Sequence, residues 1–401
     1  MLDQEVSEMQ STPVRAAHQL LAATCAALVL AGVAPNARGA AGLYVADSSG
    51  NRVVRFKSPV KKGESESLVL GQPDFTSGGG NGTQNTMNEP WSLVFQPSSG
   101  ILWVADFANS RVLGFSHGMA AFTNGQNADL VLGQPDFSNP NPTCAVTQSG
   151  LCFPADVAFD QGGNIWVADQ GGNRVLEYAP PFATGQSAAL VIGEPDFTSS
   201  SCLTAQNRLC SPFGLTFDKS GNLWVLDAGN DRILEYKPPF ATGQNASLVL
   251  GESDFTTRIC RVTQDGMCPA EFAGGVRSDS SGNIWMVDVF DNRVIEFEAG
   301  AGFVNGQNAS VVLGQADFTS RSCTTTQSGM CDPGGITFDT HGSLYVAEEG
   351  NCRVLKFKPK KKKFTDDQKA VLVLGQPDFT SNQCNVTQSN LQNPNGLGFG
   401  P

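Results

Sequence analysis

The sequence has little charge, little histidine and few aromatic residues. Of its 401 residues, 16% are charged, 8% are aromatic and three are His. With 40% hydrophobic residues and 44 glycines, the composition excludes a collagen, a coiled coil and a disordered tail. The formal net charge is −12, so the field of the protein would repel a phosphate backbone. Nucleic acid is therefore not expected as a partner.

Long apolar runs are also scarce, and the main one lies near the N-terminus. Residues 20–33 are uncharged and apolar, a length that is short for a bilayer span but fits the hydrophobic region of a secretory signal. Arg15 precedes this run and small residues at 37–40 offer cleavage sites, although the acidic residues among the first eight are untypical of a signal. We expect residues 1–40 to be an export signal segment, and the protein to be secreted or periplasmic without stable membrane insertion. An uncleaved membrane anchor is the alternative.

The remainder of the sequence is a repeat. A motif of the type Leu-Trp-Val-Ala-Asp occurs six times, with its acidic residue at Asp47, Asp106, Asp169, Asp227, Asp288 and Glu348. A second motif, Leu-Val-Leu-Gly-Gln-Pro-Asp-Phe and its variants, has its acidic residue at Asp74, Asp136, Asp196, Asp254, Asp317 and Asp378. Six copies of each motif, in register, predict six structural units.

Each unit has the pattern of four short β-strands. In the third unit the runs 156–159, 165–168, 174–178 and 189–192 are rich in β-branched and aromatic residues and are bounded by Gly, Asn, Asp or Pro. No run between them is long enough for a core helix, so we predict a four-stranded antiparallel meander. Repeated units of this kind pack as blades around an axis, which makes the expected fold an all-β propeller.

The two ends of the repeat predict how the ring closes. The first unit begins at its second strand, 43–46, and the strand that it lacks is found at 393–399. We therefore expect the C-terminal strand to join the N-terminal blade, which leaves no free edge. The expected inner strands are Trp91–Phe95, Ala155–Phe159, Phe213–Phe217, Gly274–Ser278, Gly334–Phe338 and Asn395–Phe399. The prediction is a single domain, residues 41–401, with six blades.

These motifs resemble the NHL repeat. The resemblance rests on Gly-Asn-Leu-Trp-Val-Leu-Asp227 followed by Asn-Asp-Arg232-Ile-Leu-Glu-Tyr, which has counterparts in every unit. It implies an NHL-type six-bladed propeller but no particular function, because this fold carries lyases, lactonases and binding scaffolds alike. The amidating lyases that share the repeat use several histidines for their metal, whereas His18, His117 and His341 lie in different regions here.

The cysteines are distributed with the repeat. Eight of them form four pairs that are eight residues apart, each just ahead of an inner strand: Cys144/Cys152, Cys202/Cys210, Cys260/Cys268 and Cys323/Cys331. We expect four local disulfides, because one pair per blade cannot converge on one ion and the spacing is not that of a zinc site. Disulfides also agree with export. Cys352 and Cys384 form either a fifth disulfide or two free thiols.

Two further repeated features are interpreted as structural. An acidic residue stands five positions before an Arg in every unit, as in Asp169 and Arg174, and such a pair holds a hairpin turn by charge-assisted hydrogen bonds. A catalytic site seldom needs six identical copies of one residue pair. The Trp or Tyr of each second strand is expected to pack between blades. The lysine-rich run 356–363 is interpreted as a solvated hairpin tip, with a patch for an anionic partner as the alternative.

Departures from the repeat are the better functional candidates. Polar residues stand at the start of the inner strands, where other blades have Ser, Phe or Gly: Glu89, Asp156, Glu271, Asp332, Asn393 and Asn395. Oxygen ligands that converge on the axis would suit Ca²⁺, and the resemblance implies a cation at this place in lactonase-type propellers. Ordinary turn chemistry of Asp and Asn is the alternative. Apart from Ca²⁺, no cofactor is expected.

Two functions are compatible with this sequence. The first is an exported, monomeric, non-enzymatic propeller whose disulfide-braced loop face binds a protein, a peptide or a glycan, because no convergent catalytic set is visible. The second is a Ca²⁺-dependent, lactonase- or lyase-like enzyme whose site lies at the axial mouth, where Glu89, Asp156, Glu271 and Asp332 are expected.

Overall fold

The computed structural model describes residues 41–117, 121–139, 142–269 and 275–400. The predicted export segment, residues 1–40, and the candidate Glu271 lie outside the described residues. Within the described part, no helix is long and apolar enough to cross a membrane.

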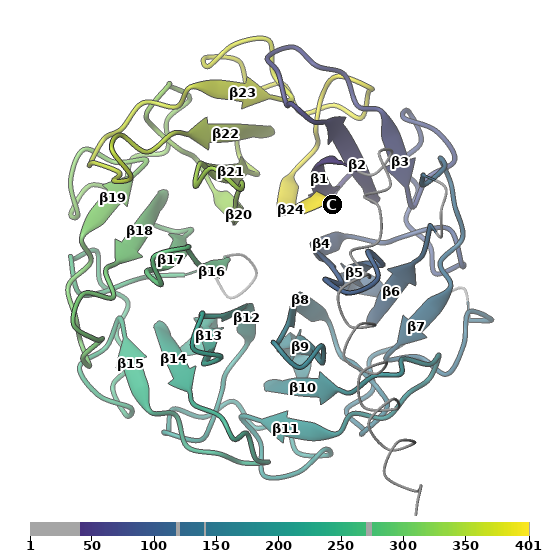
Figure 1. Cartoon of the computed structure of the whole chain (residues 1–401), viewed down its shortest axis with the longest axis horizontal. Coiled ribbons are helices and arrows are strands. Elements are labelled where there is room, and N and C mark those ends of the chain that lie inside the picture. Colours follow the sequence, from purple (N-terminus) through teal and green to yellow (C-terminus); the bar gives the residue numbers. More distant parts are fainter. Residues whose placement is uncertain (1–40, 118–120, 140–141, 270–274, 401) are drawn as a thin grey trace, which may run out of the picture. The chain divides into compact units, whose positions relative to one another are not determined.

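Six four-stranded antiparallel sheets stand around one axis (Figure 1). The first blade has the strand order β24-β1-β2-β3 from the axis outward, and the second to sixth blades hold β4–β7, β8–β11, β12–β15, β16–β19 and β20–β23. One strand of each blade contacts the corresponding strands of both neighbouring blades around the axis, which places these strands innermost: β24, β4, β8, β12, β16 and β20 (Figure 1). The predicted fold, a six-bladed all-β propeller, is confirmed.

The strands are short and similar in every blade. The innermost strands are β24 (Pro394–Gly400), β4 (Pro90–Phe95), β8 (Pro154–Phe159), β12 (Pro212–Phe217), β16 (Val276–Ser278) and β20 (Pro333–Phe338). The second strands are β1 (Gly42–Asp47), β5 (Leu102–Asp106), β9 (Ile165–Asp169), β13 (Leu223–Asp227), β17 (Ile284–Asp288) and β21 (Leu344–Glu348). The third strands are β2 (Arg52–Lys57), β6 (Arg111–Phe115), β10 (Arg174–Tyr178), β14 (Arg232–Tyr236), β18 (Arg293–Phe297) and β22 (Arg353–Phe357). The outermost strands are β3 (Leu68–Leu70), β7 (Leu130–Leu132), β11 (Leu190–Ile192), β15 (Leu248–Leu250), β19 (Val311–Leu313) and β23 (Leu372–Leu374). Three 3₁₀ turns, η1 (Phe107–Asn109), η2 (Gln170–Gly172) and η3 (Ala228–Asn230), follow the second strands of the second, third and fourth blades.

The first blade is completed by the C-terminal strand. β24 pairs with β1 in antiparallel register, with Leu43 opposite Phe399 and Val45 opposite Leu397. At the same join, Ser48 donates from its N–H and its hydroxyl to the carbonyl of Asn393. The predicted closure is therefore confirmed, and the sheet edge that a missing inner strand would expose is paired.

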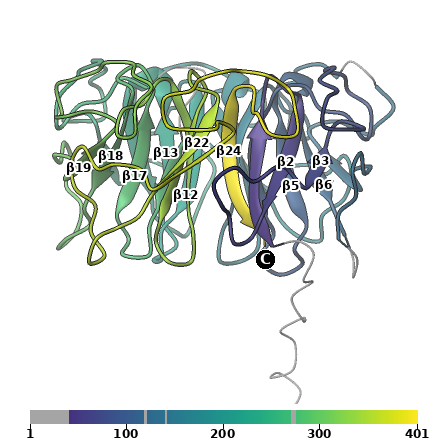
Figure 2. The same cartoon turned by 90° about the horizontal axis from the view of Figure 1, so that it is seen from above.

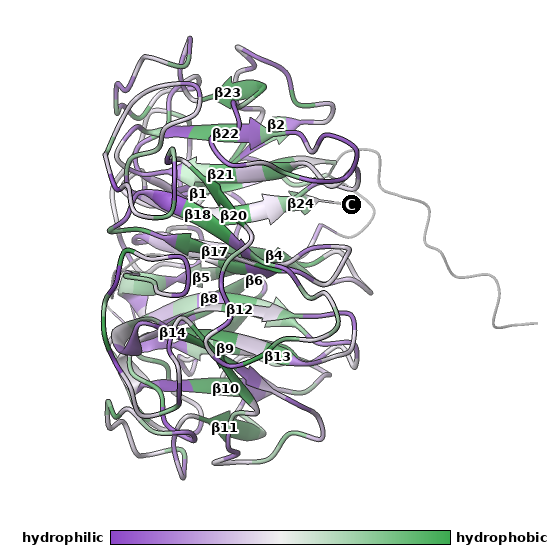
Figure 3. Cartoon of the chain, turned by 90° about the vertical axis from the view of Figure 1, so that its left-hand side faces the viewer, coloured by the Kyte–Doolittle hydropathy of each residue, from purple (hydrophilic) through white to green (hydrophobic). Residues whose placement is uncertain are grey.

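The propeller has two faces with different connections (Figure 2). We call the end at which the inner strands begin the loop face, because the long connections between blades and the turns between second and third strands lie there. The opposite end, where β24 finishes, is the hairpin face. Figure 3 shows that the hydrophobic residues concentrate in the strands and that the connections on both faces are mixed or hydrophilic.

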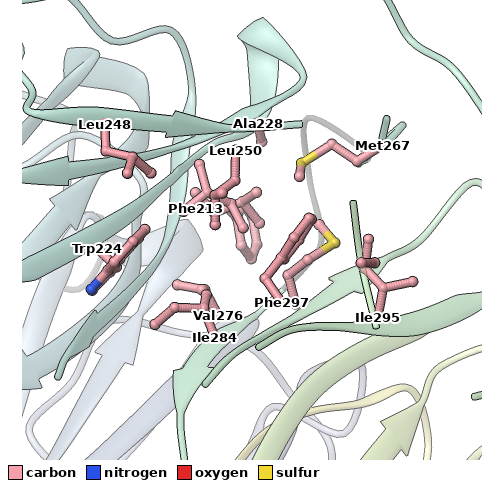
Figure 4. Packing of buried hydrophobic residues seen from close by; sticks show 14 of the residues in the cluster. Phe213, Trp224, Ala228, Leu248, Leu250, Met267, Val276, Ile284, Ile295 and Phe297 are labelled. Carbon is pink, nitrogen blue, oxygen red and sulfur yellow. The ribbon is translucent and has the colours of Figure 1, made fainter. Parts of the chain in front are cut away.

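The hydrophobic core lies between neighbouring blades. Trp166 of the third blade is fully buried and makes edge-on contact with Phe240 of the fourth blade, with ring centroids 4.9 Å apart. Figure 4 shows the corresponding packing between the fourth and fifth blades, where Trp224, Leu250 and Ile295 belong to one buried cluster. The second-strand aromatics thus pack between blades, as predicted, and each blade buries its faces against two neighbours.

Glycines let the inner strands approach one another around the axis. A Cβ atom on Gly335 of β20 would lie 2.3 Å from the carbonyl oxygen of Asn395 in β24, and one on Gly396 would lie 2.5 Å from that of Trp91 in β4. Real Cβ atoms do not come so close to backbone. Inner strands with Gly at this position can therefore pack main chain against main chain. In β4 and β8 the same position holds the larger residues Ser92 and Asp156, so these two strands do not have this glycine.

Candidate functional site

Each turn between the second and third strands is held by a buried acid–Arg pair. In the third blade, Arg174 donates from Nε to Oδ2 of Asp169 at 2.7 Å, and both side chains are fully buried. The equivalent pairs are Asp47–Arg52, Asp106–Arg111, Asp227–Arg232, Asp288–Arg293 and Glu348–Arg353. Burial raises the pKa of Asp169 to about 6, although Arg174 acts in the opposite direction.

The same arginines hold the long connections of the loop face. Arg174 donates from Nη1 to the carbonyl of Phe197, and from Nη2 to the carbonyls of Thr147 and Gly150, both at 3.0 Å. Phe197 lies in the connection that leaves the third blade, whereas Thr147 and Gly150 lie in the one that enters it. One guanidinium therefore fixes two consecutive loops, which makes the loop face a preorganised surface.

Five disulfides brace these connections. Four of them close eight-residue separations just ahead of inner strands: Cys144–Cys152, Cys202–Cys210, Cys260–Cys268 and Cys323–Cys331. The fifth, Cys352–Cys384, joins the turn of the sixth blade to the connection that returns to the first. These are the pairs that the sequence predicts, including the one for which two free thiols were the alternative. Disulfides of this number are typical of extracellular or periplasmic proteins.

In three blades an Asn side chain links the turn after the second strand to the next blade. Asn173 lies in a left-handed conformation, with φ of 51°, and its Oδ1 accepts the N–H of Ser211 at 2.8 Å. Asn292 accepts the N–H of Asp332 in the same way, and Asn51 accepts that of Glu89. The acceptor is thus supplied by one blade and the donor stands directly before the inner strand of the next.

That donor position has a constrained backbone. Glu89, Phe153, Ser211, Asp332 and Asn393 each precede the proline of an inner strand, and all have φ between 45° and 56°. Asp and Asn are tolerated in this left-handed region better than most residues. The polar residues Asp332 and Asn393 therefore occupy a turn position at which their type is favoured by the backbone alone.

The five predicted mouth residues that the structure describes do not form one cluster. Glu89 and Asp332 are exposed, and the carbonyl of Asn393 is used in the closing hydrogen bonds to Ser48. Asp156 is buried inside the channel, where it accepts from Ser92 and from the N–H of Leu215 at 2.8 Å. Of the set, Asp332 and Asn395 lie near a common neighbour, Glu349.

Glu349 is the residue of the mouth that sequence reasoning missed. Asn395, which is buried, donates from Nδ2 to Oε1 of Glu349 at 2.9 Å, and the N–H of Glu349 donates to the carbonyl of Asp332. Burial, with a smaller effect from the charge of Asp332, raises the pKa of Glu349 to about 8. Its signal in the sequence is a carboxylate at a turn position that is Ser, Phe, Gln or Ala in four other blades.

The opposite side of the mouth is aromatic. Trp91 of β4 stacks on Phe107 of η1 with ring centroids 3.9 Å apart, and Phe213 of β12 lies 4.9 Å from Trp91. Phe107 in turn is 5.3 Å from Phe153, which is 39% exposed. An aromatic path therefore leads from the axis outward across the second, third and fourth blades.

Exposed apolar side chains gather on the same sector of the loop face. Among the described residues, six large apolar side chains are exposed, and four of them lie on this face: Phe153, Leu203, Ile259 and Phe290. We call these four the apolar sector. They belong to the third, fourth and fifth blades or to the connections that enter them. Val304 and Val371, the other two, lie on the hairpin face.

Fixed negative charges surround the loop face. Asp196 is exposed, and its Oδ1 accepts the N–H groups of Thr198 and Ser199 at 2.8 and 2.9 Å. These hydrogen bonds lower the pKa of Asp196 to about 2. The equivalent carboxyls, whose pKa values are lowered for the same reason, are Asp74, Asp136, Asp254, Asp317 and Asp378. All six are ionised at neutral pH.

The described part of the chain shows neither a metal-binding cluster nor a hydrolase nucleophile elbow. No three His, Cys, Asp or Glu side chains there are grouped so as to hold a metal ion. The sequence Gly-Phe-Ser116-His-Gly has the spacing of a hydrolase nucleophile elbow, which needs a strand followed by a helix. Ser116 instead follows β6 on the hairpin face and donates to Asp129 at 2.6 Å.

Two segments of the chain match the model of a known repeat family. The model of the NHL repeat matches residues 151–178 and 330–357, which cover β8–β10 and β20–β22. Two blades of this six-bladed propeller therefore contain NHL repeats. Each match spans three strands of one blade, and both include the acid–Arg pair that holds the turn.

Several solved structures resemble this propeller at low sequence identity. A nidogen/laminin complex is 14% identical, with a TM-score of 0.47 over 90% of this chain and 98% of that one. A putative 6-phosphogluconolactonase from Bacteroides fragilis is 12% identical, with a TM-score of 0.48 over 92% and 86%. Virginiamycin B lyase from Staphylococcus aureus is 14% identical, with a TM-score of 0.41 over 80% and 81%. At these identities the likeness concerns the fold alone. No curated protein matches the sequence.

Proposed function

We propose that this propeller is an exported, monomeric, non-enzymatic scaffold that binds a protein or peptide through its loop face. The observation that carries the proposal is the apolar sector, Phe153, Leu203, Ile259 and Phe290, displayed on loops that buried arginines and disulfides hold in place. Exposed apolar side chains concentrated on one face are typical of interaction sites, and a preorganised surface loses little entropy on binding.

The charge of the face defines the partner further. Six ionised carboxylates surround the loop face, and the net charge of the chain is −12. A basic partner with apolar side chains is complementary to such a surface, because its positive charges speed the encounter and its apolar groups fill the sector. Aliphatic side chains such as Leu203 and Ile259 favour a protein or peptide over a glycan.

A synthetic amphipathic Lys/Leu peptide tests this proposal directly. We expect the wild-type protein to bind it, and the variant F153S/L203S/I259S/F290S to bind it about tenfold more weakly. The variant V304S/V371S, which changes exposed valines of the hairpin face, is the matched control and keeps wild-type affinity. Binding is measured by calorimetry, with melting temperatures to confirm that both variants fold. Equal affinity of F153S/L203S/I259S/F290S and the wild type for the peptide would contradict the proposal.

A Ca²⁺-dependent enzyme of the lactonase or lyase kind is the second candidate. It is favoured by the meeting of Glu349, Asp332 and Asn395 on one side of the mouth. The fit is partial, because Ca²⁺ takes six to eight oxygen ligands. The fourth candidate ligand, Asp156, is engaged by Arg277 at 2.8 Å. A Ca²⁺-dependent rise in melting temperature that E349Q abolishes would favour this candidate over the scaffold.

A further inference from the structure

A cavity of about 360 Å³ opens on the axis at the hairpin face. It is lined by the last residues of the inner strands, so it lies at the opposite end of the channel from the mouth described above. Phe95, Phe159, Phe338 and Phe399 contribute apolar wall, and Thr216 and Thr337 contribute hydroxyls. A volume of this size suits a small organic molecule.

Among the described residues, one charged side chain lines this cavity. It is Arg277 of β16, which stands where β12 and β20 have Thr216 and Thr337. The next residue, Ser278, takes the place of the Phe that ends the other inner strands. The fifth blade therefore departs from the repeat at two successive positions, and the first of them, Arg277, lines the cavity.

The guanidinium of Arg277 is held by one of its edges. Nη1 donates to Oδ2 of Asp156 at 2.8 Å and Nη2 approaches Oδ1 at 3.3 Å, while Nη1 also contacts the carbonyls of Leu215 and Val276. In the described part of the chain, nothing accepts a hydrogen bond from Nε or from the second N–H of Nη2. The side chain is 21% exposed, whereas that of Asp156 is 5% exposed.

Asp156 is itself fixed by neighbours from two other blades. Ser92 of β4 donates to its Oδ1, and the N–H of Leu215 of β12 donates to its Oδ2. The network therefore joins four successive blades across the channel, and Asp156 acts as a positioning residue for the guanidinium. An arginine held in this way keeps its remaining N–H pair in a set orientation, which is the geometry that a carboxylate accepts in a bidentate manner.

We propose that this axial cavity binds a small organic carboxylate with an apolar body. The carboxylate would accept from Nε and Nη2 of Arg277, and the apolar part would lie against the phenylalanine edges. Because Asp156 already balances the charge of Arg277, the site favours a single negative charge over a dianion such as phosphate. This assignment is independent of the loop face, which lies at the other end of the axis.

Calorimetry with hexanoate, hexanamide and inorganic phosphate tests the proposal. We expect hexanoate to bind about tenfold more tightly than the amide or phosphate, since the amide lacks the charge and phosphate lacks the apolar body. Equal binding of hexanoate and hexanamide, binding of phosphate as tight as that of hexanoate, or no binding of hexanoate would each overturn it.

Two variants separate recognition from folding. R277K keeps a cation beside Asp156 but removes the planar guanidinium with its paired N–H donors. We therefore expect at least about a tenfold loss of hexanoate affinity. D156G/R277T replaces both residues with those that β12 carries at the equivalent positions, Gly214 and Thr216. Because this variant leaves no unpaired buried charge, we expect it to fold but not to bind hexanoate. R208K, at a partly buried Arg of the loop face, is the control and binds as the wild type does. Wild-type affinity in R277K would exclude Arg277 as the binding group.

Discussion

Replacing Arg174 by Met is expected to lower the free energy of unfolding by about 3–5 kcal/mol at neutral pH, the usual cost of removing one partner of a buried ion pair. Asp169 would remain in the core without its counter-charge, because both side chains are fully buried. The carbonyls of Phe197, Thr147 and Gly150 would also lose their donor. Urea unfolding of the variant and the wild type measures the difference.

The pH dependence of the stability lost in the Arg174→Met variant identifies the cause of that loss. Burial raises the pKa of Asp169 to about 6 in the folded protein, so the folded state binds a proton that the unfolded state has released between about pH 4 and pH 6. The contribution of this group to stability therefore falls as pH rises through that window. Without Arg174 the pKa rises further and the decline continues to higher pH. The loss should be smaller at pH 4 than at pH 8, whereas equal losses would indicate that only packing was removed.

Lys237 provides a matched control for this substitution. Its ammonium lies 3.4 Å from Glu235, but its side chain is 60% exposed. Solvent screens such a pair, so K237M is expected to change the free energy of unfolding by less than about 0.5 kcal/mol at either pH.

The substitution D291N is expected to stabilise the protein by about 1–3 kcal/mol at neutral pH, the range for relieving a buried polar group without a partner. Asp291 is 1% exposed, and among the described residues neither of its carboxylate oxygens has a hydrogen-bond partner. Its ionic contact, Arg293 at 3.4 Å, is shared with Asp288. In the fourth blade the same position is Asn230, which donates to Asp227 at 2.8 Å.

Thermal and urea unfolding between pH 4 and pH 8 test this substitution. Burial raises the pKa of Asp288 to about 7, and the charge of Asp291 acts in the same direction. Burial also raises the pKa of Asp291. Stability of the wild type should therefore fall as pH rises from about 4 to 7, and D291N should flatten this decline. The reciprocal variant N230D is expected to be less stable than the wild type, with a steeper decline. A D291N variant that is less stable than the wild type at pH 8 would contradict the interpretation.

The sequence predicts the fold well because the fold is periodic. Strand patterns, the acid–Arg pairs and the eight-residue cysteine spacing recur in several units, so each unit supports the interpretation of the others. The closing strand follows from the same logic, since the first unit lacks the strand that 393–399 supplies. Local spacing likewise predicts Cys144–Cys152, whose two cysteines lie in one short loop.

The candidate sites depend on residues that meet only in the ring. Arg277 and Asp156 are 121 positions apart, and nothing in the local sequence of either predicts the other. Glu349 gains its surroundings from Asn395, 46 positions later. Glu89, Asp332 and Asn393 stand out as polar departures from the repeat, yet they share a left-handed backbone position with Phe153 and Ser211. The structure shows the backbone conformation that these five positions share.

The pairing of β24 with β1 also orders the events of biosynthesis. The last of the described strands to leave the ribosome is the one that the first blade needs at its inner edge, as its register with β1 requires. Blades two to six can pair their own strands while the chain is still growing. The first blade stays incomplete, and its interface with its neighbours stays open, until the chain has been made up to Gly400. Ring closure is therefore a late event, because it follows the synthesis of all the other described strands of the ring.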